Sequence, residues 1–191
     1  MSTVTTTWHP AGTGFPVPPP PPIAPGGQPL AEFSDRLLAY LIDGAIYLAV
    51  LSVPLLVGFV GLVRWMAHLS DGEQQRITEG KMPLGVLAAL SLFVAVYMAL
   101  QLIVTFLYAG LYQARRNGQT VGKRVMRIRV VRLDGGPFDL ATATIRWLFQ
   151  SVAGLVPYYS TLDGLWQLWD KPYRQCLHDK GADTVVIKVD G

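Results

Sequence analysis

Arg36 and Asp43 stand in the first long apolar stretch of this 191-residue sequence. At 3.6 residues per turn they fall on one helical face, about 10 Å apart along the axis. A carboxylate in an apolar span is costly unless a partner satisfies it, and such groups mark either ion pathways or paired structural networks. Asp43 is therefore a candidate for ion-coupled proton exchange, because desolvation raises a carboxyl pKa and a nearby cation lowers it.

Other polar residues in later apolar or closing segments are candidate partners for these two. Arg146 or Gln101 is expected to meet Asp43, while Arg36 is expected to extend to the headgroups or to pair with an aspartate. Gln101 also begins a polar stripe with Thr105, Tyr108 and Tyr112 at helical spacing. The predicted polar network comprises Arg36, Asp43, Gln101, Arg146, Asp163 and Asp179.

The composition indicates an all-α integral membrane protein. Hydrophobic residues make up 51% of the chain and charged residues only 15%, and the mean hydropathy is +0.33. Soluble domains carry about 25% charged residues. Residues 37–63 and 84–112 are each long enough to cross a bilayer, which takes roughly 20 residues. We therefore expect two full transmembrane helices within a domain spanning residues 31–191, with Pro54 as a source of a kink.

The third apolar region, residues 141–169, has two interpretations. It is either one kinked span or a short helical hairpin that enters the membrane and returns. Residues 125–131 and 184–189 both read as strands, and an isolated strand is unstable, so we expect them to pair as a small β-hairpin-like element. That pairing puts the tail, residues 170–191, on the same side as the loop 113–140 and favours the hairpin.

Charge distribution predicts the orientation. Residues 64–83 contain three basic and three acidic residues, whereas residues 113–133 contain seven basic residues and no acid. By the positive-inside rule the second segment is cytoplasmic, and with two spans before it the N-terminus is cytoplasmic too. We therefore expect a multi-pass protein of the plasma membrane. Because the cluster lies between apolar regions and lacks interleaved aromatics, the expected partner is anionic lipid rather than nucleic acid; the contacts would be Arg115, Arg116, Lys123 and Arg124.

Residues 1–30 hold nine of the fourteen prolines. This segment cannot bury a core and is predicted to be disordered or polyproline II in the cytoplasm. It is interpreted as a solvated spacer or, alternatively, as the ligand of a proline-binding protein partner.

Neither an enzyme nor a cofactor site is expected. Gly118–Lys123 is similar to a phosphate loop but is one residue short, and Arg124 stands where a magnesium-binding Ser or Thr is needed. Cys176 is the single cysteine, and the pair His178–Asp179 lacks further ligands at metal-binding spacing.

Three segments, in this order, resemble the RDD family of membrane proteins, named for one arginine and two aspartates. They are Phe33–Asp43, Gly118–Arg124 with the following Ile128–Val131, and Arg174–Asp179 with Thr184–Val186. The resemblance covers about residues 31–189. It implies that Arg36 and Asp43 are the family's arginine and first aspartate, and that the second is Asp163 or Asp179. Sodium/proton exchange has been suggested for some members.

Two function hypotheses follow. In the first, the polar network lines a pathway for an ion or small solute, and a domain this small would then work as a homo-oligomer. In the second, the network fixes helix packing in a non-catalytic accessory or scaffolding protein that recruits partners through its proline-rich tail and basic loop.

Overall fold

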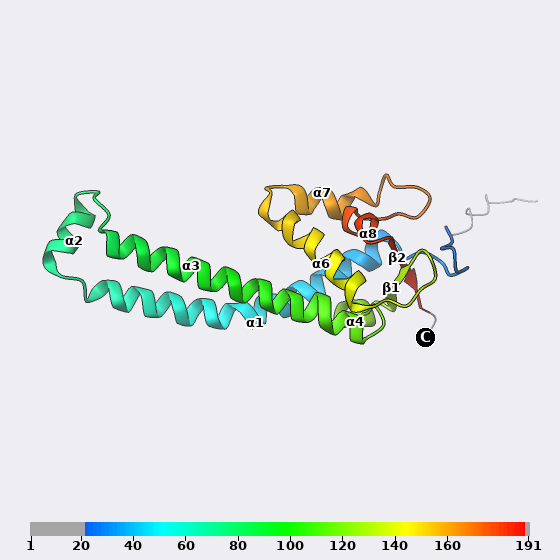
Figure 1. Cartoon of the computed structure of the whole chain (residues 1–191), viewed down its shortest axis with the longest axis horizontal. Helices are drawn as coiled ribbons and strands as arrows, with labels where there is room; N and C mark the ends of the chain where they lie inside the picture. The colour runs from blue at the N-terminus through cyan, green and yellow to red at the C-terminus, as the bar shows by residue number, and fades with distance from the viewer. Residues whose placement is uncertain (1–21, 190–191) are drawn as a thin grey trace, which may run out of the picture.

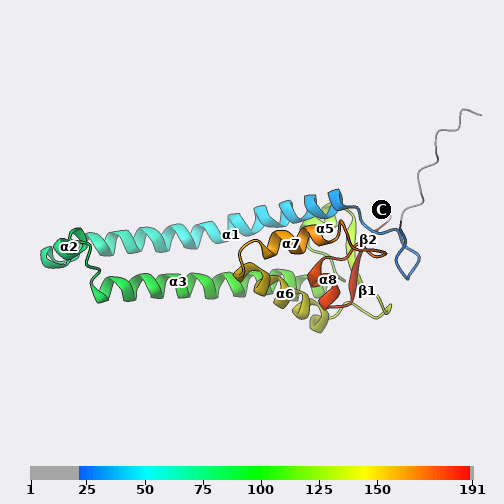
Figure 2. The ribbon, with the colours of Figure 1, turned by 90° about the horizontal axis from the view of Figure 1, so that it is seen from above.

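Two long antiparallel helices dominate the computed structural model, which describes residues 22–189 (Figures 1 and 2). Helix α1 covers Phe33–Ala67, and α3 covers Leu84–Thr105. The π-helix η1 (Phe106–Tyr112) and the short α4 (Gln113–Arg115) continue α3 without a break. At the far end the small helix α2 (Asp71–Thr78) connects the two.

Both long helices are long and apolar enough to cross a membrane. Only 6% of the most apolar window of each is buried, so their apolar faces are open, unlike those of a core helix in a soluble protein. The predicted spans 37–63 and 84–112 lie inside these two helices. Pro54 stands within α1, which the structure shows as one continuous helix.

The third apolar region folds as a helical hairpin. Helices α6 (Leu140–Leu155) and α7 (Tyr159–Trp166) meet at Tyr158, whose φ is +66°. At 1.5 Å per residue they are about 24 Å and 12 Å long, so neither crosses a hydrocarbon core of about 30 Å. Of the two interpretations of residues 141–169, the structure has the hairpin. In Figure 1 α7 runs back toward the end from which α6 started.

A two-stranded antiparallel sheet forms the other end of the molecule. Strand β1 (Ile128–Arg132) pairs with β2 (Thr184–Lys188) in a register that sets Val130 opposite Val186. The expected pairing of these two segments is thus confirmed. The short helices α5 (Val121–Val125) and α8 (Leu177–Gly181) directly precede the strands. We call this end of the molecule, with the first turns of α1, the sheet end.

The segment before α1 lies along the free side of β2. The amide of Ala31 donates to Val186 O (2.9 Å), and that of Lys188 donates to Pro29 O (2.9 Å). Ile23 bridges back to Pro29, and Leu30 is only 2% exposed. Residues 22–30 therefore form an ordered turn beside the sheet, which corrects their inclusion in a disordered tail: the turn bonds to itself, and its end at Pro29 bonds to β2. The prediction for residues 1–21 falls outside the described part of the chain.

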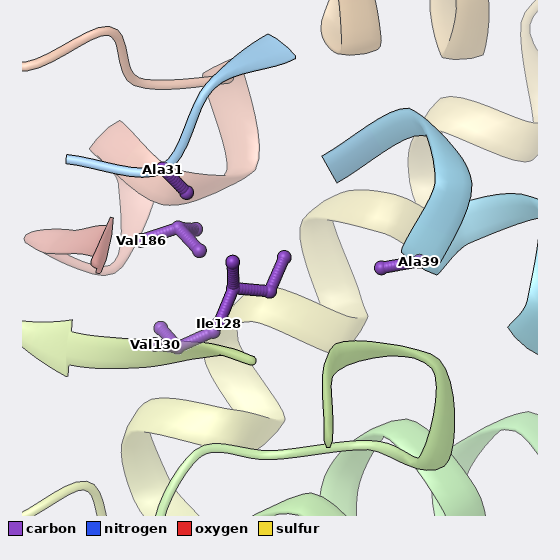
Figure 3. Packing of buried hydrophobic residues seen from close by; sticks show 5 residues of the cluster. All are labelled: Ala31, Ala39, Ile128, Val130 and Val186. Atoms are coloured by element: carbon purple, nitrogen blue, oxygen red, sulfur yellow. The ribbon is translucent and has the colours of Figure 1, made fainter. Parts of the chain in front are cut away.

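The hydrophobic core lies at the sheet end. Ala31, Ala39, Ile128, Val130 and Val186 pack together between the sheet and the first turns of α1 (Figure 3). A second cluster, on the other face of β2, joins Leu30 to Val185 and Ile187. The described fold is thus mostly helical, with two candidate membrane-spanning helices anchored in a small packed end.

Candidate functional site

Asp43 accepts three hydrogen bonds at the junction of α1, η1 and α5. Its Oδ1 accepts from the Tyr108 hydroxyl (2.7 Å) and the Gly122 amide (2.8 Å), and its Oδ2 accepts from the Thr120 hydroxyl (2.6 Å). The Asp43 residue is 7% exposed. Three donors at these distances satisfy both oxygens of the Asp43 carboxylate.

The glycines of the segment Gly118–Lys123 allow this approach. A Cβ on Gly122 would lie 2.2 Å from the Ala39 carbonyl oxygen, so only glycine lets α5 touch α1 here. Gly118 has φ +83°, and a Cβ there would lie 2.2 Å from Val130 O. Thr120 caps α5 by accepting from the Lys123 amide. The segment Gly118–Lys123 therefore binds the carboxylate of Asp43 from the same chain.

Tyr108 comes from the π-helical turn η1. Its hydroxyl also accepts from the Val121 amide (3.1 Å), and its ring contacts Tyr47 edge-on and stacks on Tyr112. The π-turn widens the helix locally, and such turns are frequent at functional sites. Tyr108 thus joins the second long helix to both α1 and α5.

These contacts correct the expected partners of Asp43. Neither Arg146 nor Gln101 bonds to it; hydroxyls and a backbone amide do. Between Arg36 and Asp43 it is Ala39 that packs inward (2% exposed), while Tyr40 is 71% exposed. Gln101 instead borders an open groove between α1 and α3, described below.

A second site surrounds Asp179, which is completely buried. Its Oδ2 pairs with Arg36 Nη1 at 3.4 Å and accepts from the Cys176 amide at 3.0 Å, while its Oδ1 contacts Arg146 Nη1. Arg36 also donates to the carbonyl of Arg174 (2.8 Å), and Arg146 to the Thr184 hydroxyl. One carboxylate thereby connects α1, α6 and α8.

Opposing effects act on the pKa of this carboxyl. Burial raises it, but the charges of Arg146, His178 and Arg36 outweigh burial and hold the pKa of Asp179 well below its usual range. The surrounding positive charges therefore favour the ionised form of Asp179.

Asp163 joins the same site through His178. The His178 Nδ1 lies 2.6 Å from Asp163 Oδ2, and its Nε2 lies 3.4 Å from Asp179 Oδ1. The His178 amide also donates to Asp163 Oδ1 (2.9 Å). The structure therefore brings together Arg36, Arg146, Asp163 and Asp179, as predicted for the network, but in a site distinct from that of Asp43.

Lys123 interacts with both sites. It is half-buried, and burial followed by the charge of Arg146 lowers its pKa to about 8, against the attraction of Asp43 and Asp179. Within residues 22–189 no hydrogen bond or ion pair holds its amine. It also lies apart from the other three predicted lipid contacts: Arg115, Arg116 and Arg124 line a hollow that Lys123 does not border.

Cys176, His178 and Asp179 have ligand atoms close enough to surround a metal ion, but the surroundings do not suit one. Two guanidinium groups already neutralise Asp179. Burial also raises the pKa of the Cys176 thiol, which disfavours the thiolate that binds metals. The arrangement is that of an ion-pair network.

Two apolar helices joined to a polar, basic end are typical of an α-helical membrane protein. An RDD family domain matches residues 30–183, so the chain belongs to the RDD family. No curated protein and no solved structure matches the chain.

Sequence reasoning missed the roles of Thr120, Gly122, His178 and Thr184. For the first two the signal was present, since a Gly-x-Thr-x-Gly pattern indicates a backbone that binds an anion. For His178 and Thr184 no local pattern exists, because Asp163 lies 15 positions before His178 and Arg146 lies 38 positions before Thr184.

Gly122→Ala is expected to destabilise the protein by about 1–3 kcal/mol or more, because the added methyl overlaps Ala39 O. The matched control is Gly44→Ala, where a Cβ meets nothing within 4 Å. Thermal unfolding in neutral detergent measures both. Equal unfolding temperatures for the two variants would contradict the close contact of α5 with α1.

Asp179→Asn leaves two buried guanidinium groups without a counter-charge and is expected to cost about 3–5 kcal/mol. Asp134→Asn makes the same chemical change in an exposed pair with Arg132 and is expected to have little effect. Unfolding by heat or denaturant in detergent compares the two. If Asp179→Asn unfolded at nearly the wild-type temperature or denaturant concentration, the Asp179 carboxylate would not be needed to stabilise the sheet end.

Proposed function

We propose that both long helices cross the plasma membrane, with the sheet end and the N-terminus in the cytoplasm. In α1, residues 44–63 carry no charge, and these twenty residues rise about 30 Å, the thickness of a hydrocarbon core. Asp43 and Arg64 border that stretch. The seven basic residues of 113–133 all belong to the sheet end, which supports a cytoplasmic location.

We further propose that the protein is a non-catalytic accessory or scaffolding protein. Its buried polar residues would fix the basic sheet end to the two long helices α1 and α3. The observation that carries this is the complete satisfaction of the site carboxylates. Asp43 has three donors, and Asp179 has two guanidinium groups and an amide. Carboxylates so bonded serve packing, because a transported cation would have to displace several bonds at once.

A carrier is the second candidate, and one observation favours it. A groove of about 280 Å³ opens between α1 and α3, and its mostly apolar lining includes Ser52, Gln101 and two tyrosines beside three leucines: Tyr47, Tyr97, Leu48, Leu51 and Leu55. Tyr47 also contacts Tyr108, which bonds Asp43. The groove is open on one side, so a pathway along it would need a second copy of the chain to close it.

Orientation is tested by cysteine labelling. Lys81→Cys, between α2 and α3, is expected to react with a membrane-impermeant maleimide on intact cells, whereas Arg127→Cys reacts only after permeabilisation. Both positions are exposed, and the native Cys176 is buried. Labelling of residue 127 from outside would refute the proposed topology.

Proteoliposome assays separate the two functions. Lumenal pH is followed after addition of sodium, potassium or lithium to vesicles containing wild type, Asp43→Asn or Gly44→Ala, with an ionophore to verify that the vesicles are tight. The accessory role predicts no cation-driven pH change for folded wild type, and a lower unfolding temperature for Asp43→Asn. A pH change that Asp43→Asn abolishes and Gly44→Ala retains would establish exchange instead.

A further inference from the structure

A basic pocket opens at the sheet end beside the junction of η1, α4 and α5. Its volume is about 260 Å³, close to the lower limit of about 300–1,000 Å³ for small-ligand sites. No acidic residue borders it. Its lining consists of Tyr112, Arg115, Arg116, Asn117, Gln119, Thr120 and Arg124.

The three arginines of this pocket differ from those that hold the fold. Arg36 and Arg146 pair with Asp179, and Arg132 pairs with Asp134. In the part of the chain that the structure describes, Arg115, Arg116 and Arg124 have no carboxylate partner. Three guanidinium charges around one hollow repel one another, so an anion in the hollow relieves that repulsion.

The depth of the pocket follows from the Asp43 site. Tyr108 bonds Asp43, which borders the uncharged stretch of α1, so both lie at the edge of the hydrocarbon. Tyr112 is one turn further along the helix, about 6 Å beyond that edge. Headgroup layers are about 5–8 Å thick on each side of the core. Tyr112 and the pocket therefore lie at the level of the lipid phosphates.

We propose that this pocket binds the phosphate group of an anionic phospholipid in the inner leaflet. Guanidinium groups match phosphate oxygens with paired donors, and Arg116 is already oriented by its position over the Tyr112 ring, 5.7 Å from the centroid. The binding site rests on the orientation proposed above. It deepens the accessory role by naming the chemical class that the basic end recognises.

The pocket shares a residue with the Asp43 site. Thr120 borders the pocket and donates to Asp43 through its hydroxyl. A bound headgroup holds the segment from Arg116 to Thr120 in place, and this segment positions α5 against α1. Binding therefore raises the unfolding temperature of the whole protein, by mass action on the folded state.

The test uses the full chain in neutral detergent, titrated with short-chain phosphatidylglycerol or, as the zwitterionic comparison, phosphatidylcholine. Bound lipid is counted by native mass spectrometry, and unfolding temperature is recorded in parallel. The pocket variants are Arg115→Gln and Arg124→Gln. The matched control is Arg127→Gln, which removes one charge from an exposed arginine of the same basic segment outside the pocket. Each pocket variant is expected to weaken phosphatidylglycerol binding about tenfold, and the control less than twofold.

A competition arm identifies the source of the phosphate. If millimolar inorganic phosphate displaces phosphatidylglycerol, the pocket binds phosphate also from soluble ligands; if it does not, the lipid is required. Equal weakening by Arg127→Gln, or equal binding of the two lipids by wild type, would overturn the proposal. Neither result depends on cation flux, so the accessory function and the lipid site are judged separately.

Discussion

The buried charge of Asp179 is the interaction on which the sheet end depends. It pairs with the guanidinium groups of Arg36 from α1 and Arg146 from α6. Arg36 also donates to the Arg174 carbonyl, and Arg146 to the Thr184 hydroxyl. Ions this far from water are tolerated only while every partner remains in place. The first turn of α1, the hairpin of α6 and α7, and strand β2 are therefore held in one arrangement. The bonds of Asp43 to Thr120 and Gly122 then fix the start of α5 against α1.

The sequence predicts elements better than it predicts partners in this protein. Hydropathy locates both long helices, residue alternation locates β1, and a run of β-branched residues locates β2, because each signal is local. The pairing of the strands followed from the instability of a lone strand. The partners of Asp43 could not be predicted the same way: a search for charged or amide groups passes over Thr120 and Gly122, whose donors are a hydroxyl and a backbone amide.

The segment Gly118–Lys123 shows why a motif needs its structural context. Its glycines resemble those of a phosphate loop for a physical reason, since amides at the start of a helix bind anions whatever their source. In this chain the anion is the Asp43 carboxylate. The pattern thus reports that an anion is bound, while the missing residue and Arg124 distinguish this segment from a nucleotide site.

The contact between Arg36 and Asp179 joins residues 143 positions apart in the chain. During synthesis α1 is made long before the counter-charge of its arginine exists, so in the proposed topology this helix enters the bilayer with Arg36 still solvated or among headgroups. Only when the last segment emerges can the two arginines be neutralised and the sheet close. Assembly is therefore completed from the C-terminal end, and a nascent chain stopped before α8 has both long helices but no ion pair to lock them.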